Sequence, residues 1–358
     1  MMNSQEAKIL AIDLLTELIR IPSYSREEKE VADMLQSAMN GLGLKVERKY
    51  NNIWTVGLKK KNRPTILLNS HIDTVRPGSE WTDDPFIPKK NDGRITGLGS
   101  NDAGASVVSL LAVYILLKDI ELPFNLIYSA TAEEEISGKN GVESILGDLG
   151  QIDLGIVGEP TGMNLAIAEK GLMVLDCVAT GIRSHAARNE GVNAVYEAIK
   201  DIERIKKIKF PEKSKLLGNV TMQVTMINSG EAHNIVPGSC SFVVDVRTNE
   251  YYANREIFDI LKSLLKCDVR SRSFRLNPSF ISEDHPVVLR AKEMGLKCYG
   301  SNTLSDHALM SFPTVKIGPG DPQRSHISDE HIMVNEIYEG IDIYTDLISK
   351  LKIDETLG

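Results

Sequence analysis

The chain has 358 residues, of which 42% are hydrophobic and 25% are charged, and its 41 basic and 49 acidic residues give a formal net charge of −8. These values are ordinary for a globular protein, and the length favours two domains over one hydrophobic core. A mildly acidic chain lacks the basic face that nucleic-acid binding normally requires. The N-terminal segment has no secretory signal pattern, and no run approaches the roughly 18 apolar residues that span a bilayer. We therefore expect a cytoplasmic protein with neither a nucleic-acid nor a membrane partner.

Helical and strand patterns alternate through the N-terminal part of the chain. Apolar residues at helical spacing predict a helix over 7–19, and Ser25 with Glu28 fits a capping box that predicts a second helix through Met39. The elements predicted next are strands over 45–58, 65–70, 124–130 and 153–157 and helices over 103–117 and 141–146. This rhythm predicts an α/β domain with a mixed, mostly parallel sheet.

A different pattern occupies residues 171–277, where the strands alternate apolar and polar residues, as in 219–227. Such alternation is typical of an antiparallel sheet with one buried face. The predicted order is strand 173–180, helix 192–206, strand 220–227, strand 240–247, helix 255–265 and strand 268–276. This is the β-α-β-β-α-β order of a ferredoxin-like α+β domain.

The first pattern returns with a helix over 286–294 and a strand over 314–317, so the small domain is predicted to be inserted into the large one. Residues 1–170 and 278–358 then form one domain and residues 171–277 the other. Arginines scattered through the strand at 268–276 are typical of an exposed edge. We expect the inserted domain to mediate a homodimer.

Side chains that can bind metals follow strand-like runs in five segments. They are His71, Asp102, Glu134 with Glu135, Glu159 and His326. In open α/β sheets, loops at the carboxyl ends of the strands direct side chains into one crevice. Two histidines and at least three carboxylates suit zinc or a related divalent metal. Two metals bridged by one carboxylate and a water would use the whole set.

Each segment alone has a more ordinary interpretation. His71 could be a hydrogen-bonded histidine at a strand end, Asp102 a helix N-cap, and Glu133 to Glu135 a solvated acidic turn. The glycine pattern over 97–104 does not fit a dinucleotide loop, because an acid at Asp102 would repel a pyrophosphate. The prediction of a metal site therefore depends on the segments occurring together.

Four further residues are candidates for supporting roles. Asp73 lies two residues after His71 and could contact its imidazole. In the small domain, His185 taken alone is more typical of a surface histidine. Asn234 and Arg247 could belong to a turn and a salt bridge, or could bind a substrate carboxylate.

The chain resembles the dinuclear zinc amidohydrolases that include acetylornithine deacetylase, succinyl-diaminopimelate desuccinylase, aminoacylase and glutamate carboxypeptidase. The resemblance covers essentially the full length and is closest to acetylornithine deacetylase-type members. It rests on the segments SHIDTV, GLGSNDAG, TAEEEISG, VGEPT, GIRSHAA, HNIVP, DVR and GPGDPQRSH, which occur in the family's order. An inserted dimerisation domain is also a trait of this family.

The resemblance implies a role for each candidate residue. His71 and Glu159 would hold one zinc ion and Glu135 and His326 the other, with Asp102 bridging them and cobalt as a possible substitute. Asp73 would orient His71, and Glu134 would be the general base unless a shift of one residue promotes Glu133. His185 would reach the partner subunit's site and steady the oxyanion, while Asn234 and Arg247 would bind the substrate carboxylate. Two departures from the family pattern, at Arg188-Asn189-Glu190 and at Glu133, leave the acyl preference open.

The reaction implied is hydrolysis of an N-acyl amino acid, with N2-acetylornithine, acetylcitrulline or succinylornithine as expected substrates in arginine biosynthesis. A dipeptidase or carboxypeptidase of the same family would share every metal residue. A non-catalytic protein that binds a metal or an amino acid is a further alternative. The intact Glu134 beside complete ligands counts against a non-catalytic protein.

Overall fold

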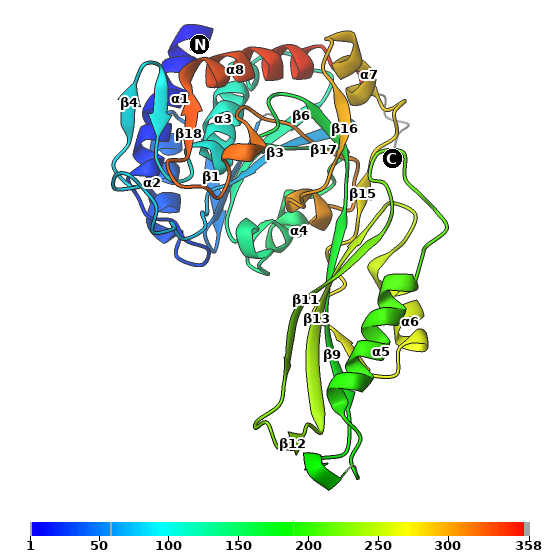
Figure 1. Cartoon of the computed structure of the whole chain (residues 1–358). Helices are drawn as coiled ribbons and strands as arrows, with labels where there is room; N and C mark the ends of the chain where they lie inside the picture. Colours follow the sequence, from blue (N-terminus) through cyan, green and yellow to red (C-terminus); the bar gives the residue numbers. More distant parts are fainter. Residues whose placement is uncertain (1, 58, 189, 354–358) are drawn as a thin grey trace. The chain divides into compact units, whose positions relative to one another are not determined.

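The computed structural model describes residues 2–57, 59–188 and 190–353, which form two compact units (Figure 1). The larger unit takes residues up to 167, residues 281–299 and those from 305 onward. The smaller unit takes residues 168–280 together with 300–304.

The larger unit contains most of a nine-stranded mixed sheet. In spatial order its described strands are β1 (Val46–Lys49), β2 (Asn52–Val56), β6 (Asn125–Thr131), β3 (Thr65–His71), β7 (Leu154–Val157), β17 (Thr314–Lys316), β8 (Leu165–Glu169) and β15 (Ser279–Phe280), with β16 (Cys298–Ser301) paired to β8. Strand β15 and the ends of β8 and β16 belong to the smaller unit. The central strands β6, β3, β7 and β17 are parallel, whereas the flanking strands pair in antiparallel fashion. The predicted α/β class with a mixed sheet is confirmed.

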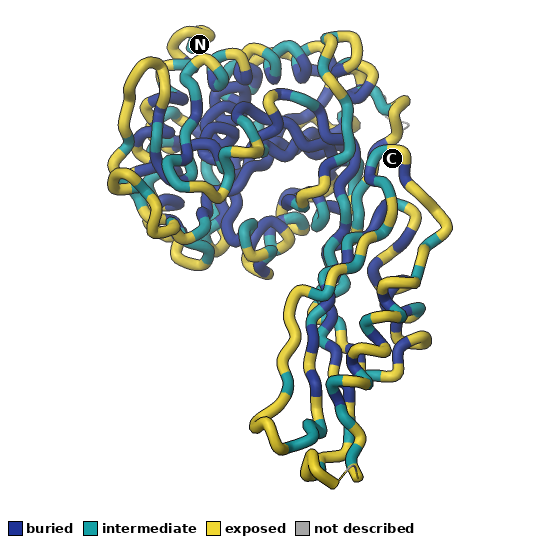
Figure 2. Tube along the Cα trace, viewed as in Figure 1, coloured by how far each residue is buried: buried dark blue, intermediate teal, exposed yellow. Residues whose placement is uncertain are grey.

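Strands β3 and β6 are buried along their whole length, and Figure 2 shows the central strands of this unit as buried. Their buried polar residues satisfy one another across the sheet. Asn69 accepts a hydrogen bond from the hydroxyl of Ser129 at 2.6 Å and donates one to Asp306 at 2.9 Å. Thr131 also donates to Asp306 at 2.9 Å. This pairing avoids the cost of leaving polar groups unsatisfied in a core.

Helices and a small second sheet complete the larger unit. The helices are α1 (Ser4–Ile19), α2 (Lys29–Gly41), α3 (Ala105–Leu117), α4 (Leu146–Leu149), α7 (Pro286–Glu293) and α8 (Val334–Ser349). The second sheet joins β18 (His331–Met333), β5 (Arg94–Thr96) and β4 (Lys89–Asn91) in antiparallel order.

Helix α3 forms part of the core and packs against α1 and α8. Contrary to our expectation from the sequence, the helical segment over 100–117 is long and apolar enough to cross a membrane by length and composition. However, 89% of this window is buried inside the fold, which is typical of the core helix of a globular unit.

Three local predictions were wrong. Within the predicted strand over 45–58, residues 46–56 form a hairpin, because Tyr50 adopts a φ of +54° and turns the chain between β1 and β2; residue 58 lies outside the described residues. The predicted helix over 141–146 is a short 3-10 turn followed by α4. The capping box at Ser25 and Glu28 does not form. Both side chains bind other loops of the larger unit instead.

The smaller unit has the predicted β-α-β-β-α-β order. Its elements are β9 (Gly171–Thr180), α5 (Ala194–Lys207), β11 (Thr221–Ser229), β13 (Ser239–Thr248), α6 (Asn254–Leu264) and β14 (Asp268–Ser271). The strands form an antiparallel sheet in the order β11-β13-β9-β14. Residues of α5 and α6 pack with the alternate strand residues Leu175, Cys177 and Phe242 in one core, so both helices cover the same face.

The edges of this sheet differ in detail from the prediction. β14 lies at one edge, as predicted, but it is shorter than the predicted strand over 268–276. β11 forms the other edge and is exposed along much of its length (Figure 2). Its predicted alternation ends at an irregularity between Val224 and Met226, beyond which Met226 is 64% exposed.

Candidate metal centre

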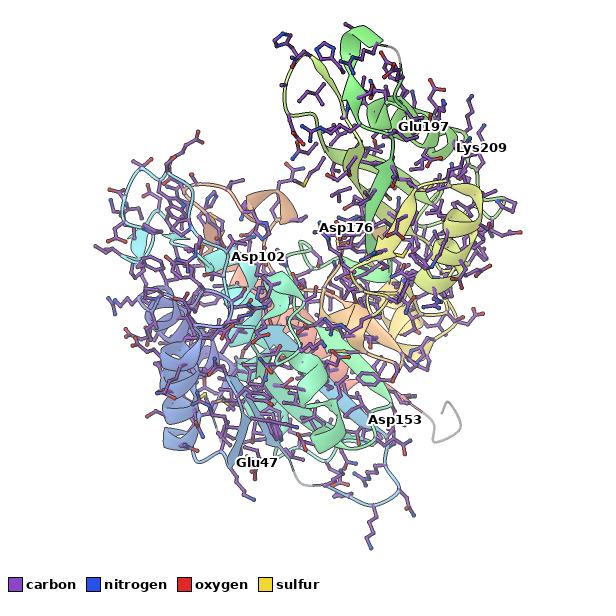
Figure 3. The ribbon with its side chains drawn as sticks, turned by 90° about the horizontal axis from the view of Figure 1, so that it is seen from below. Glu47, Asp102, Asp153, Asp176, Glu197 and Lys209 are labelled. Atoms are coloured by element: carbon purple, nitrogen blue, oxygen red, sulfur yellow. The ribbon has the colours of Figure 1, made fainter. Side chains whose placement is uncertain are left out.

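Six candidate ligands reach one place because their strands end at one edge of the sheet. His71 is the last residue of β3, and the acidic pair Glu134 and Glu135 follows β6. Glu159 follows β7, and His326 lies beyond β17. Asp102 comes from the loop that precedes α3 (Figure 3). Since β6, β3, β7 and β17 are adjacent and parallel, their carboxyl ends meet.

Asp102 lies between the two histidines, with one carboxylate oxygen facing each. Its Oδ1 lies 3.3 Å from His71 Nε2, and its Oδ2 lies 3.5 Å from His326 Nε2. His71 Nε2 is also 3.7 Å from Glu159 Oε1, and His326 Nε2 is 3.0 Å from Glu135 Oε2. Asp102 is therefore shared between two sets of ligands.

The donor set fits two divalent cations. Ligand atoms of His71, Glu134 and Glu159 lie within 4.8 Å of one another, as do those of His71, Asp102 and Glu135. Four carboxylates this close repel one another unless a cation neutralises them. Imidazole nitrogens and carboxylate oxygens are the ligands that zinc and related metals accept.

Backbone contacts orient His71 for a metal. Its Nδ1 lies 2.9 Å from the carbonyl oxygen of Asp73 and 3.5 Å from the carboxylate of Asp73. When Nδ1–H donates to this carbonyl, Nε2 is the ring nitrogen that can bind a metal once it has lost its proton.

The carboxylate of Asp73 has a second task that the sequence did not reveal. It accepts hydrogen bonds from the N–H groups of Glu134 at 3.0 Å and Glu135 at 3.1 Å and from the hydroxyl of Ser25 at 2.7 Å. Burial raises the pKa of Asp73, but the bonds from His71, Ser25 and Glu134 outweigh burial and lower it overall. Asp73 thus stays ionised and positions the acidic turn as well as the imidazole.

The geometry distinguishes Glu133 from Glu134. The carboxylate of Glu133 accepts hydrogen bonds from the backbone and side-chain amides of Asn140 at 3.3 and 3.0 Å. Glu134 instead belongs to the ligand group with His71 and Glu159. Burial raises its pKa well above the usual range; the charge of His71 opposes this rise, and the charges of neighbouring acids add to it. A carboxylate with a raised pKa suits a general base that works near neutral pH, which supports Glu134 in this role.

The smaller unit carries the remaining candidates at opposite ends of its sheet. His185 and Asn234 are neighbours, because β10 (Ser184–His185) pairs with β12 (Ile235–Val236) and Ala186 N–H donates to the carbonyl of Asn234 at 3.0 Å. Arg247 lies near the far end of β13 and binds Asp245 through two hydrogen bonds of 2.8 and 3.1 Å. The eight steps from Ser239 to Arg247 span roughly 27 Å of strand. One copy of this unit therefore does not bring Asn234 and Arg247 to the same carboxylate, contrary to the simplest form of our expectation.

Lys170 was missed by the sequence analysis. Burial lowers the pKa of its ammonium group, and the charge of Arg247 lowers it further. In the sequence, only its place directly before β9, in the segment Glu169-Lys170-Gly171, could have indicated a cation near the start of that strand.

The fold and the site define a metal-dependent amidohydrolase. Residues 67–350 match the sequence profile of peptidase family M20/M25/M40, and the chain belongs to this family of hydrolases that act on amide bonds. The resemblance noted from the motifs is thus confirmed.

Two curated relatives and one solved structure illustrate the range of this family. The chain is 24% identical over 374 aligned positions to a succinyl-diaminopimelate desuccinylase of Xylella fastidiosa, covering 96% of this chain and 98% of that one. It is 24% identical over 354 positions to an acetylornithine deacetylase of Myxococcus xanthus, covering 90% and 92%. A tripeptidase from Staphylococcus aureus superimposes with a TM-score of 0.76 at 22% identity over 98% of both chains, which shows the shared fold.

The pairing of His326 with Glu135 makes metal binding depend on pH. This hydrogen bond raises the pKa of His326 to about 9, so the metal-free imidazole is protonated at neutral pH and must lose its proton to bind a metal. We expect the affinity for the metal that binds His326 to rise by about tenfold per pH unit from neutral pH towards the pKa of His326. Calorimetric titrations of the metal-free protein in buffers of different ionisation enthalpy should show the released proton. An affinity that stays constant over this range would contradict the pairing.

Proposed function

We propose that this protein hydrolyses the amide bond of an N-acyl amino acid, with N2-acetylornithine, acetylcitrulline or succinylornithine as candidate substrates in arginine biosynthesis. The observation that carries the proposal is the position of Asp102, whose two oxygens face His71 and His326 with Glu134 alongside. This is the arrangement that a two-metal hydrolase requires. The acetylornithine deacetylase among the relatives supports the choice of acyl amino acid.

In this proposal the ligands divide into two sets. His71 and Glu159 would hold one zinc ion, Glu135 and His326 the other, and Asp102 would serve both. Bound zinc supplies Lewis acidity, which polarises the substrate carbonyl and lowers the pKa of a nearby water. Cobalt accepts the same donors and is a reasonable substitute.

Glu134 carries the proton through the reaction. Its carboxylate accepts a proton from the attacking water as the oxygen adds to the carbonyl carbon, and returns that proton to the nitrogen as the C–N bond breaks. The products are a carboxylate and a free α-amine. Glu133 cannot share this task while Asn140 holds its carboxylate.

We also propose that the site is completed across a homodimer. His185 would stabilise the oxyanion, Asn234 would bind the substrate carboxylate from the same end of the sheet, and Arg247 with Lys170 would bind a carboxylate from the other end. Because β13 separates these groups, residues from both ends would act on one substrate only if they came from two subunits. The inserted unit would then be the dimerisation domain.

A second candidate function is peptide hydrolysis by the same metal residues. A pocket of about 390 Å³ adjoins His326 and is lined by Val75, Trp81, Leu98 and Ile327 among others. An acetyl group needs only on the order of 90 Å³ if each of its three heavy atoms takes about the volume of a water. The pocket therefore has room for a larger acyl group or a peptide residue, as a dipeptidase or carboxypeptidase would need.

A substrate panel separates these functions. We expect zinc- or cobalt-loaded protein to hydrolyse acetyl- or succinyl-amino acids with a higher kcat/KM than dipeptides that carry the same amino acid. Release of the free amine can be followed for each compound. A higher kcat/KM for the dipeptides would favour the peptidase, and hydrolysis of none of them would contradict the proposed function.

The assignment of the base is tested by a matched pair of variants. Glu134→Gln should bind metal normally but lose about 10²- to 10⁴-fold in kcat, because the amide cannot accept the proton. Glu133→Gln should keep most of kcat, because its carboxylate binds only Asn140. Single-turnover rates and metal content of both variants check this. Retained activity in Glu134→Gln with loss in Glu133→Gln would move the base to Glu133.

Completion of the site by two subunits predicts complementation. His185→Ala and Arg247→Ala should each be inactive alone. A dimer with one variant chain of each kind should have one intact site, so random mixing should restore about a quarter of wild-type activity. Co-expression with two affinity tags isolates the mixed dimer. Failure of the isolated mixed dimer to recover activity would show that these residues do not act from different subunits.

A further inference from the structure

Glu330 is a buried acid that binds the backbone of the loop carrying Asp102. Only 2% of Glu330 is exposed. Its Oε1 accepts hydrogen bonds from the N–H groups of Asn101 and Asp102, both at 2.8 Å, and its Oε2 accepts one from Gly99 at 2.9 Å. Three backbone donors of one short loop thus converge on one carboxylate.

The loop needs these bonds because it is tightly folded and not yet helical. Gly99 has a φ of +73°, and a Cβ at Gly104 would lie 2.4 Å from the carbonyl oxygen of Gly99. Asp102 itself has non-helical backbone angles just before α3. N–H groups in such a turn lack partners in a helix, and leaving buried donors unsatisfied is costly. The carboxylate of Glu330 replaces those missing partners.

Glu330 also links the two segments that meet at the candidate metal centre. It lies four residues after His326 and directly before β18, which pairs with β5. The N–H of Gly97 donates to the carbonyl oxygen of Glu330 at 3.0 Å, so backbone and side chain hold the same loop. A shift of Glu330 would move the backbone of Asp102 relative to His326.

We propose that Glu330 is a positioning residue. It fixes the backbone from which Asp102 reaches both histidines, and it thereby sets the affinity for the more weakly bound of the two metals. The proposal rests on the two-metal function proposed above. Replacing a residue that hydrogen-bonds to a metal ligand typically changes the metal affinity by 10- to 100-fold. The side chain of Glu330 accepts hydrogen bonds from backbone N–H groups, so Glu330 acts on the site through the backbone of Asp102.

Two variants of Glu330 remove different numbers of its hydrogen bonds and should therefore lower metal affinity to different extents. Glu330→Ala removes all three hydrogen bonds. Glu330→Gln keeps an oxygen for Asn101 and Asp102 but places an amide NH₂ opposite the N–H of Gly99, so its effect should be smaller. We expect the weaker of two Zn²⁺ sites to lose about 10- to 100-fold in affinity in the alanine variant. The glutamine variant should fall between the alanine variant and the wild type.

Asp201→Asn is the matched control. Asp201 is also a buried acid that accepts backbone hydrogen bonds, from Lys266 and Cys267, but it belongs to the core of the smaller unit. Its replacement should lower the thermal unfolding temperature and leave both Zn²⁺ affinities within about twofold. The control therefore separates loss of stability from loss of positioning.

The measurement is calorimetric titration of metal-free full-length protein with Zn²⁺, alongside thermal unfolding. If Glu330→Ala does not fold, the glutamine variant decides. Folded Glu330 variants that bind both Zn²⁺ ions within about twofold of wild type would overturn the positioning role alone. A wild-type protein that binds fewer than two Zn²⁺ ions would overturn the two-metal function, and the positioning role with it.

Discussion

Four carboxylates and two imidazoles meet at one edge of the larger unit's sheet. The mutual repulsion of the carboxylates is the constraint on which the surrounding structure depends. The loops that carry these groups are held through their backbone N–H groups by other acids. Asp73 binds the acidic turn after β6, Glu28 accepts from the N–H of Glu133 at 3.2 Å, and Glu330 binds the loop before α3. These N–H groups favour the ionised form of each supporting acid, and they outweigh burial only together with His71 and Ser25 at Asp73, whereas burial raises the pKa of Glu28 and raises that of Glu330 to about 8.

That the candidate ligands come together could be predicted from the sequence, because each follows a strand-like run or opens a helix. Parallel central strands then bring their ends together without further information. The hydrogen bonds that support these ligands could not be predicted. Ser25 and Glu28 have the spacing of a capping box, and only the fold reveals that they bind Asp73 and Glu133 instead. Glu330 lies 228 residues from Asp102, so no local pattern connects the two.

The secondary structure, like the candidate site, could be predicted only in part. Long periodic segments such as α3 and β9 were predicted within a few residues. The hairpin at Tyr50 was not, because a positive φ at a tyrosine has no sequence signal comparable to glycine. In the smaller unit, spacing along the chain gave no hint that Asn234 lies beyond the start of β13 and Arg247 near its other end. Motifs that follow one another in the sequence therefore do not necessarily bring their residues to the same ligand.

The pairing of the two strands at the ends of the inserted segment bears on how that segment can vary in length and sequence. β8 leads out of the larger unit and β15 leads back, and the two pair in register, with Ala168 opposite Phe280 and Glu169 opposite Ser279. Neighbouring strands lie only about 4.8 Å apart, a gap that a tight turn can close. The sheet that carries the metal ligands is therefore nearly continuous across the point of insertion. Lengthening, exchanging or losing the intervening segment would therefore leave the hydrogen-bonded frame of the candidate metal centre in place.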